Sequence, residues 1–207
     1  MKIQFLVDNP NSWINEYVAE WAKEFRADFI NDHSRIQKGD ILILLSCERK
    51  LEKRALNKFN LVVHESDLPE GKGWSPLTWQ VLEGRNKLTV SLIEAEEKID
   101  AGAIYFQEKI QLNGHELIPE LREKQAEATF ALLKKFIRQY PNITSRPQVG
   151  KESFYPKRRQ ADSELDISKT LDSQFNLLRV CDNDRYPAFF VKNGVKYLLK
   201  IEKDERH

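Results

Sequence analysis

The stretch NLVVHESDLPEGKGWSP, residues 60–76, decides how the rest of the chain is arranged. Its apolar run Leu61–Val63 has the length and β-branching of a buried strand. A polar loop rich in proline and glycine follows from His64, and Ser75-Pro76 then has the residues of a helix N-cap and first helical position. Because ligands of open α/β sheets bind beyond the carboxyl ends of the strands, His64 stands where chemistry is usually done.

The preceding part of the chain predicts the strand next to this one. Residues 41–45 form a continuous apolar run, which is typical of a parallel strand covered on both faces. A polar loop over 46–48 follows, and a short helix is expected over 51–58. Strand, helix, strand implies a right-handed parallel crossover. The 46–48 loop and the His64 loop should therefore lie side by side at one edge of the sheet.

Hydrophobic periodicity and turn residues assign the remaining elements. The fold class they predict is α/β, a Rossmann-like and mostly parallel sheet with helices on both faces. A first domain is expected over 1–145, and an extension over 146–207 with a helix and a β-hairpin, whose Asn193-Gly194 is a type I′ turn signal. The other expected strands are 2–7, 27–30, 87–94 and 104–106, and the other expected helices are 13–25, 77–82, 115–140 and 168–180.

Composition limits the classes of function. Hydrophobic residues make up 41% and charged residues 31% of the chain, which is ordinary for a globular protein, and no run approaches the roughly 18 apolar residues of a membrane helix. No secretory signal opens the chain, so a cytoplasmic location is expected. The 33 basic residues nearly cancel the 32 acidic ones, which predicts neither nucleic acid nor membrane as a partner. Cys47 and Cys181 are expected to be reduced thiols, and no metal site is predicted.

Three further polar groups are weaker signals. Asp100 stands in a charged loop, and Gly102 would give the backbone freedom to bring this carboxylate inward, although Asp-x-Gly alone is typical of a simple turn. His33 is expected in a solvated loop. The basic run Lys157-Arg158-Arg159 is expected on a solvated surface.

Taken together, these pieces resemble a known family. The pattern that carries the resemblance is His64-x-Ser66-x-Leu68-Pro69, Gly73-x-x-Pro76-x-x-Trp79, Gly84, Thr89 and Asp100-x-Gly102-x-Ile104. It resembles the formyltransferases that use 10-formyltetrahydrofolate, and the interval from His64 to Asp100 is similar to that of members acting on tRNA and on sugars. The match covers roughly residues 41–106, with further family-like pieces at 155–166 and 179–190.

Within the family, the chain is most similar to short sugar N-formyltransferases, which act on amino groups of nucleotide-linked deoxysugars. Residues 63–69 resemble the branch that acts on pseudaminic-acid-type sugars. Members acting on tRNA carry a sizeable C-terminal β-barrel, for which residues 151–207 are too few and not markedly basic. The resemblance thus implies a one-carbon transferase with 10-formyltetrahydrofolate as donor, an amino sugar as acceptor and no metal.

The implied reaction needs a base and an oxyanion donor. By resemblance, His64 accepts the proton of the attacking amine, and Asp100 orients its imidazole or relays the proton through water. A donor to the oxyanion is commonly worth about 3–4 kcal/mol of barrier, yet the family's asparagine two residues before the histidine is replaced by Val62. Asn60 shares the strand face but lies about 13 Å from His64 at the strand rise. Protonated His64, a backbone N–H or another loop takes this role, or the protein is not an efficient enzyme.

The resemblance also assigns binding residues and leaves alternatives open. Lys72 would meet a diphosphate and Trp74 would stack on a ring, or they are a solvated lysine and a loop anchor. Hydrolysis of the formyl folate and a non-catalytic binding module are the alternative functions, and the exposed edge of the C-terminal hairpin could form a homodimer. The predicted folate-binding residues are Ser46, Cys47, Glu48, Glu97, Ile99 and Asp100, and the predicted sugar-nucleotide-binding residues are Asn9, Ser66, Lys72, Gly73 and Trp74.

Overall fold

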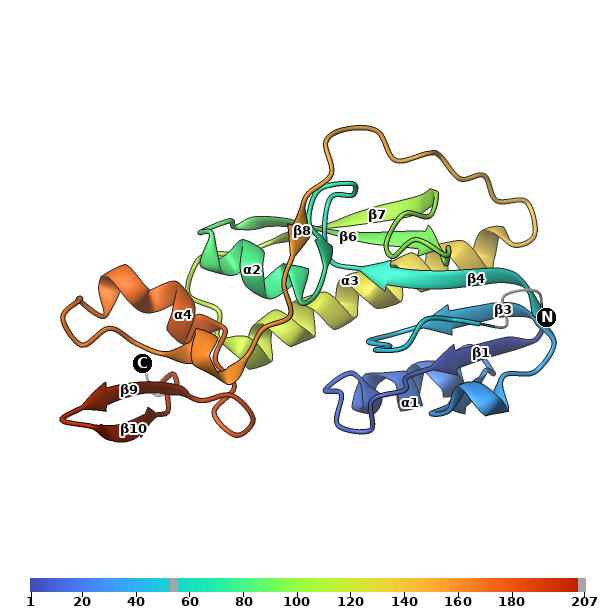
Figure 1. The fold of residues 1–207 in the computed structure, drawn as a ribbon. Helices are drawn as coiled ribbons and strands as arrows, with labels where there is room; N and C mark the ends of the chain where they lie inside the picture. Colours follow the sequence, from blue (N-terminus) through green and yellow to red (C-terminus); the bar gives the residue numbers. More distant parts are fainter. Residues whose placement is uncertain (53–55, 205–207) are drawn as a thin grey trace.

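A six-stranded sheet organises the protein, of which a computed structural model describes residues 1–52 and 56–204 (Figure 1). The strand order is β2-β1-β3-β4-β6-β7. The first four strands in this order pair in parallel, while β6 and β7 run antiparallel to their neighbours. The bounds are β1 Ile3–Leu6, β2 Asp28–Ile30, β3 Gly39–Leu44, β4 Asn57–His64, β6 Lys87–Glu94 and β7 Ile104–Gln111.

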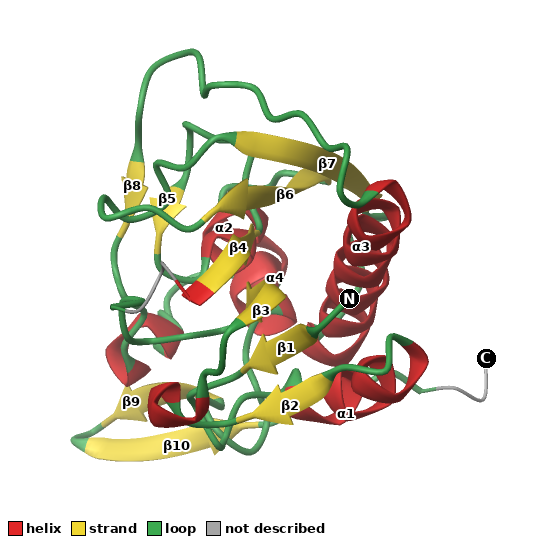
Figure 2. Ribbon diagram, turned by 90° about the vertical axis from the view of Figure 1, so that its right-hand side faces the viewer, coloured by secondary structure: helices red, strands yellow, loops and turns green. Residues whose placement is uncertain are grey.

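The longer helices α1 (Asn15–Glu24) and α3 (Ile118–Gln139) lie together on one side of the sheet, as Figure 2 shows. Their apolar faces pack with alternate residues of the strands in the main core, which includes Phe5, Leu61 and Phe136. On the opposite face, the short 3₁₀ helix η1 (His33–Arg35) leads into Ile36, which packs in a second apolar cluster. This mostly parallel sheet flanked by helices confirms the predicted fold class.

The central strand β3 is covered on both faces by apolar clusters. Ile41 and Ile43 face the main core, while Leu42 and Leu44 face the second cluster. All four side chains are buried, as the continuous apolar run predicted. β3 pairs in parallel with β4, so the loops that follow these two strands leave from the same edge of the sheet.

Two predicted helices differ from the structure. The helix expected over 51–58 overlaps β4, which already begins at Asn57 beside Gly39, and residues 53–55 lie outside the described part of the chain. The helix expected over 168–180 is reduced to η4 (Asp172–Gln174) and α4 (Phe175–Arg179). Side chains in this region bond to nearby backbone, for example Ser173 Oγ to the carbonyl of Thr170 at 2.9 Å, and such bonds compete with a helix.

Beyond α3 the chain runs back past β7 and meets the loop that follows β4 (Figure 1). There β8 (Phe154–Tyr155) pairs in parallel with β5 (Lys72–Gly73), a contact that the sequence did not predict. Two residues, Trp74 and Ser75, separate β5 from the helix α2 (Pro76–Leu82), which has Pro76 at its first position as expected. The loop after β4 is therefore held from both sides.

The C-terminal extension has a small core of its own. After η3 (Gln160–Ser163), Leu165, Leu178, Cys181 and Ala188 form a separate apolar cluster. The hairpin of β9 (Ala188–Lys192) and β10 (Val195–Leu199) turns at Asn193 and Gly194, whose φ angles of 52° and 76° confirm the type I′ turn. Among the described residues, no helix has both the length and the apolar character that a membrane crossing requires.

A buried ion pair fastens this extension to the rest of the protein. Arg179 of α4 and Glu116, just before α3, are 1% and 2% exposed, and Arg179 Nη2 lies 3.2 Å from Glu116 Oε2. The Arg179 Nε also donates to the Glu116 backbone carbonyl at 3.1 Å. The pair is therefore both charged and hydrogen-bonded where water is excluded.

We predict that Arg179→Ala lowers the free energy of unfolding by about 3–5 kcal/mol, because it leaves a buried carboxylate without its cation. The control is Arg85→Ala, which removes an exposed arginine paired with Glu70 and Glu83 and should cost about 1 kcal/mol or less. Denaturant titration of both variants measures the difference. Equal losses for the two variants would contradict the assigned role of the buried pair.

Candidate active site

His64 is the last residue of β4 and points to the carboxyl edge of the sheet. Its side chain is 5% exposed, and Nε2 lies 2.8 Å from the carbonyl oxygen of Gly71. A carbonyl only accepts, so Nε2 carries a proton and donates it to this bond. In the neutral ring this leaves the lone pair of Nδ1, which faces the carboxylate of Asp100 at 3.6 Å.

Asp100 reaches His64 from the loop between β6 and β7. Its backbone is left-handed, with φ of 51°, and its Oδ2 accepts the backbone N–H of Gly73 at 2.9 Å. The structure thus brings together the two predicted catalytic side chains, which come from different loops. Gly73, predicted as a substrate-binding residue, instead holds the carboxylate through its N–H.

Gly102 has a different reason to be glycine from the one that the sequence suggested. Its φ does not need the glycine-only region, but a Cβ here would stand 1.8 Å from the carbonyl oxygen of Glu94. The Asp100 loop is pressed directly against the end of β6, and only a residue without a side chain allows this approach. Gly73 needs to be glycine for both reasons: its φ is 97°, and a Cβ there would meet the carbonyl oxygen of Tyr155 at 2.4 Å.

Asp8, which the sequence reading missed, fixes the predicted folate loop. It follows β1, and its carboxylate accepts the backbone N–H groups of Glu48 at 2.8 Å and Arg49 at 3.0 Å. His33 Nε2 lies 3.0 Å from the same carboxylate, so His33 is half-buried and paired, not solvated as predicted. Despite burial, these bonds and the charge of His33 hold the pKa of Asp8 below its usual value. The position of Asp8 at the carboxyl end of a parallel strand, where ligands of such sheets bind, could have identified it from the sequence.

An apolar floor lies between the predicted folate loops. Val62, half-buried on β4, packs against the cluster that contains Leu44 and Ala95, and Cys47 joins the same cluster. Burial raises the pKa of the Cys47 thiol to about 12, and its Sγ lies 3.3 Å from the carbonyl of Leu6. The thiol is therefore a packed, protonated group. The backbone of Ser46 is left-handed, with φ of 50°, where the chain turns away from β3.

Four side chains from separate segments form a connected cluster over the same edge. Asn9 Nδ2 donates to Glu48 Oε1 at 3.1 Å, and Lys157 Nζ donates to Glu48 Oε2 at 3.4 Å. The same ammonium lies 4.3 Å from the centre of the Trp74 ring. Asn9, Glu48 and Trp74 were predicted as site residues, and the structure joins them through Lys157, which was predicted to be solvated.

Other predicted residues have different surroundings. Lys72 is 1% exposed and its Nζ pairs with Glu152 Oε1 at 2.6 Å, so its ammonium is committed within the protein, contrary to the predicted contact with a diphosphate. Ser66 is buried, and its backbone carbonyl accepts Ser91 Oγ at 2.7 Å. Glu97 and Ile99 are exposed on the Asp100 loop.

Arg158, within the predicted solvated run, is in contact with the C-terminal extension. Its guanidinium donates to Ser163 Oγ at 3.1 Å and to the carbonyls of Val180 and Asp162. These bonds hold the chain just after Lys157. Just before it, the carbonyl of Pro156 accepts Trp79 Nε1 at 2.9 Å. The backbone of Lys157 is therefore fixed from both sides.

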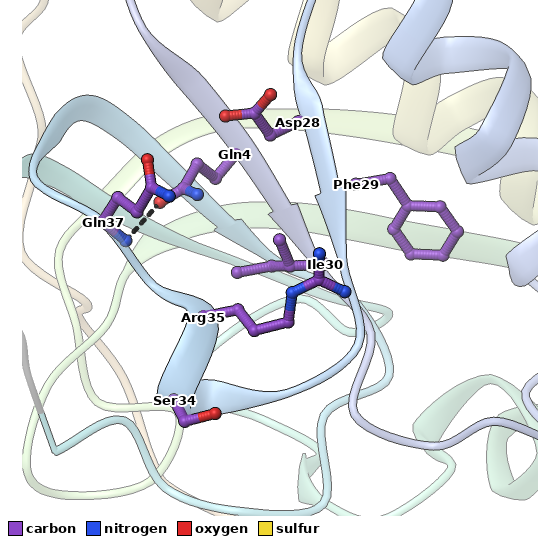
Figure 3. Close-up of a pocket in the computed structure, with 7 residues that line it drawn as sticks. All are labelled: Gln4, Asp28, Phe29, Ile30, Ser34, Arg35 and Gln37. Carbon is purple, nitrogen blue, oxygen red and sulfur yellow. Dashed lines mark hydrogen bonds between the residues drawn. The ribbon is translucent and has the colours of Figure 1, made fainter.

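A cavity elsewhere does not coincide with this site. It measures about 370 Å³ and lies between η1 and the outer strands β1 and β2 (Figure 3). Neither His64 nor Asp100 lines it. Its lining residues are Gln4, Asp28, Phe29, Ile30, Ser34, Arg35 and Gln37. Among the described residues, no group of three or more histidine, cysteine or acidic side chains is placed to hold a metal ion.

A match to the formyl transferase family covers residues 7–137, from the end of β1 to the last turns of α3. The chain belongs to the formyl transferase family. His64, Asp100 and the 46–48 loop lie inside the matched region, while β8 and the C-terminal extension lie outside it. Three of the four proteins named in the next two paragraphs are formyltransferases by name.

A curated relative is the methionyl-tRNA formyltransferase of Thermosipho melanesiensis, 31% identical over 146 residues, which are 70% of this chain and 48% of that protein. The chain thus spans about half the length of the curated relatives it matches. Among solved structures, a methionyl-tRNA formyltransferase from Clostridium thermocellum superposes with a TM-score of 0.83 at 19% identity, covering 99% of this chain and 94% of that one.

Two further structures share the formyl transferase fold. A 4-N formyltransferase from Francisella tularensis superposes with a TM-score of 0.74 at 17% identity, covering 99% of this chain and 98% of that one. HypX from Aquifex aeolicus, in complex with tetrahydrofolic acid, superposes with a TM-score of 0.76 at 19% identity, covering 97% of this chain and 37% of that one. At these identities the likeness shows the fold.

Glu65, the residue after His64, adds a further carboxylate in this member of the formyl transferase family. Its Oε1 accepts Gln125 Nε2 from α3 at 2.6 Å. Burial raises the pKa of Glu65 above its ordinary value of 4.5, and the nearby His64 and the bond from Gln125 oppose this rise only in part. The sequence reading passed over Glu65, because a single glutamate after a strand carries no distinctive signal.

We predict that Glu65 makes the stability of the protein fall as the pH rises. A carboxyl whose folded pKa is raised contributes stability below about 4.5, its unfolded value, and loses it as the pH rises through the folded value. Glu65→Gln, which keeps an acceptor for Gln125, should therefore gain in melting temperature relative to the wild type between pH 4.5 and pH 8. Glu108→Gln, at an exposed position of β7, is the control. A difference in melting temperature between Glu65→Gln and the wild type that stays constant with pH would contradict this role of Glu65.

Proposed function

We propose that this chain transfers the formyl group of 10-formyltetrahydrofolate to the amine of a nucleotide-linked amino deoxysugar. The observation that supports this most is the pairing of His64 and Asp100, two polar side chains, 6% and 10% exposed, that meet at the carboxyl edge of the sheet. When bound, 10-formyltetrahydrofolate supplies the formyl carbon and takes the electrons of the carbon–nitrogen bond that breaks. His64 receives the proton that the amine loses and returns it to the departing nitrogen.

The hydrogen bonds of His64 suit this task. Because Nε2 is tied to the Gly71 carbonyl, Nδ1 is the nitrogen with a free lone pair. Once Nδ1 takes a proton, both ring N–H groups face acceptors, the second being Asp100 at 3.6 Å. The Asp100 carboxylate therefore favours the charged imidazole that forms during the reaction.

The residues around the floor fit a flat, polar-edged ring such as the pterin of the donor. Val62 and Cys47, both half-buried, pack with Ala95 in one apolar cluster. Asp8 pins the backbone of the 46–49 loop through two N–H groups, so this loop is ordered for binding. We assign Ser46, Cys47 and Glu48 with Glu97, Ile99 and Asp100 to this contact.

The acceptor would approach over Trp74 and Lys157. An exposed aromatic ring and an adjacent ammonium suit a nucleotide or sugar ring and its phosphates, with Asn9 and Glu48 beside them. A solved sugar N-formyltransferase from Shewanella sp. FDAARGOS_354, which superposes on 99% of this chain with a TM-score of 0.71 at 18% identity, supports a sugar amine. The balanced net charge of +1 gives no support to tRNA. We propose the pseudaminic-acid type of sugar as the first to test.

Val62 sets a limit on this proposal. It cannot donate a hydrogen bond where charge develops on the formyl oxygen. Both N–H groups of protonated His64 face Gly71 and Asp100, so in this proposal a backbone N–H or a side chain of another loop takes over this role. A slow enzyme is the consequence that we expect.

We predict that His64→Asn reduces formyl transfer by about 10²–10⁴-fold, because the amine then has no base to take its proton. The matched control is His115→Asn, at an exposed position before α3, which should leave the rate unchanged. The measurement is mass spectrometry of nucleotide amino sugars that gain one formyl group, with release of tetrahydrofolate followed in parallel. Undiminished transfer by His64→Asn would rule out its role.

The same assay separates the alternatives. Formate released without any acceptor would indicate a hydrolase, and tight binding of tetrahydrofolate with no turnover would indicate a binding module. Formylation of methionyl-tRNA in place of every sugar tried would favour the function of the curated relatives.

We further propose that two copies associate through the C-terminal hairpin. In the described part of the chain no strand pairs with the outer edge of β10, and Val195, Tyr197 and Leu198 are about half exposed on it. Sedimentation should give the mass of a dimer for the wild type, and Leu198→Lys should shift it towards the monomer. A monomeric wild type at micromolar concentration would contradict this proposal.

A further inference from the structure

The strap, which we define as residues 146–153, crosses the two loops that carry the catalytic pair. Arg146 exchanges two backbone bonds with Ile104, at 2.8 and 2.9 Å, where β7 begins. At its other end Ser153 Oγ accepts the N–H of Gly71, whose carbonyl holds His64. Val149, in the middle, is 82% exposed. The strap is therefore held by polar contacts and not by burial of apolar side chains.

Gln148 makes the most specific of these contacts. Its Nε2 donates to the backbone carbonyls of Asp100 and Gly102, each at 2.8 Å. Both partners are carbonyl oxygens, which only accept, so the atom that meets them must be the NH₂ nitrogen of the amide and not its oxygen. Its Oε1 is buried and has no hydrogen-bond partner among the described residues, a loss that the two bonds to the loop must outweigh.

The Asp100 loop needs such support. Asp100 has a left-handed backbone, which a residue with a Cβ adopts only where its surroundings hold it there. Gly102 fixes the far end of the turn against Glu94, but it does not touch the residue that bears the carboxylate. Gln148 joins both residues from a segment outside the family match.

We propose that Gln148 is a positioning residue of the reaction. By bridging the carbonyls of Asp100 and Gly102, it keeps the Asp100 carboxylate within reach of His64 Nδ1 and of the Gly73 N–H. The proposal rests on the proposed function as far as turnover is concerned. The position of the carboxylate, however, is observable without any substrate, through the hydrogen bond of 2.9 Å from Gly73.

The experiment compares Gln148→Met, which has similar length but no donor, with Gln148→Glu, which keeps the shape but lacks the N–H groups. Val149→Ala, at the exposed neighbouring position, is the matched control. For each variant we measure kcat and KM for the amine acceptor, and the chemical shift and exchange rate of the Gly73 amide proton by NMR without ligands. Thermal unfolding confirms that the variants are folded.

We expect both Gln148 variants to lower kcat by about tenfold to 10²-fold, because displacing a catalytic group by about 1 Å reduces the rate by up to that factor. KM for the amine should change less than about threefold, and the Gly73 amide proton should shift and exchange faster. Val149→Ala should match the wild type in all respects. A role in stability alone would lower the melting temperature while leaving kcat and the Gly73 signal of the folded protein unchanged.

Wild-type kcat and an unaltered Gly73 amide in both Gln148 variants would overturn the proposal. If the wild type transfers no formyl group to any acceptor, the proposed function fails, while the Gly73 measurement still decides whether Gln148 positions Asp100. The two failures are thus distinguishable.

Discussion

The site depends on two places where backbone meets backbone without a side chain between them. Gly102 lies against the carbonyl of Glu94, and Gly73 lies against the carbonyl of Tyr155. The first contact brings the Asp100 loop down onto the end of β6, and the second brings the loop after β4 against β8. Between them the Gly73 N–H meets the Asp100 carboxylate, and the same carboxylate faces His64. A Cβ at either glycine would separate the loops whose meeting creates the candidate active site.

Around this meeting point, hydrogen bonds and ion pairs hold the loops in place, whereas apolar packing holds the rest of the fold. Asp8 holds the backbone of the 46–49 loop, Glu152 accepts the ammonium groups of Lys72 and Lys98, and Gln148 holds the Asp100 turn. Loops at the end of a sheet have little apolar area to bury, so hydrogen bonds and ion pairs must order them.

Sequence reasoning succeeded where the signal was local. The apolar run 41–45 identified the central strand, and β-branched residues followed by His64 placed this histidine at the carboxyl edge. It failed where distant segments decide the outcome. The two-residue pairing of β5 with β8 has no periodicity to detect, and it buries Lys72 against Glu152, so a lysine that looked solvated is internal. Gln148 was missed for the same reason, and so was the contact of the exposed Lys157 with Glu48, because the partners are about 50 to 110 residues away along the chain. The helix expected over 168–180 failed for a local reason, competition from side-chain bonds to the backbone.

The central claim is that His64 and Asp100 act as one unit, and a double-mutant cycle tests it most directly. His64→Asn, Asp100→Asn and the double variant are compared with the wild type in kcat/KM for formyl transfer. Groups that act as a unit are strongly non-additive, so we expect a double variant about as slow as the slower single variant. Losses that multiply in the double variant would show two independent residues and rule out a catalytic unit.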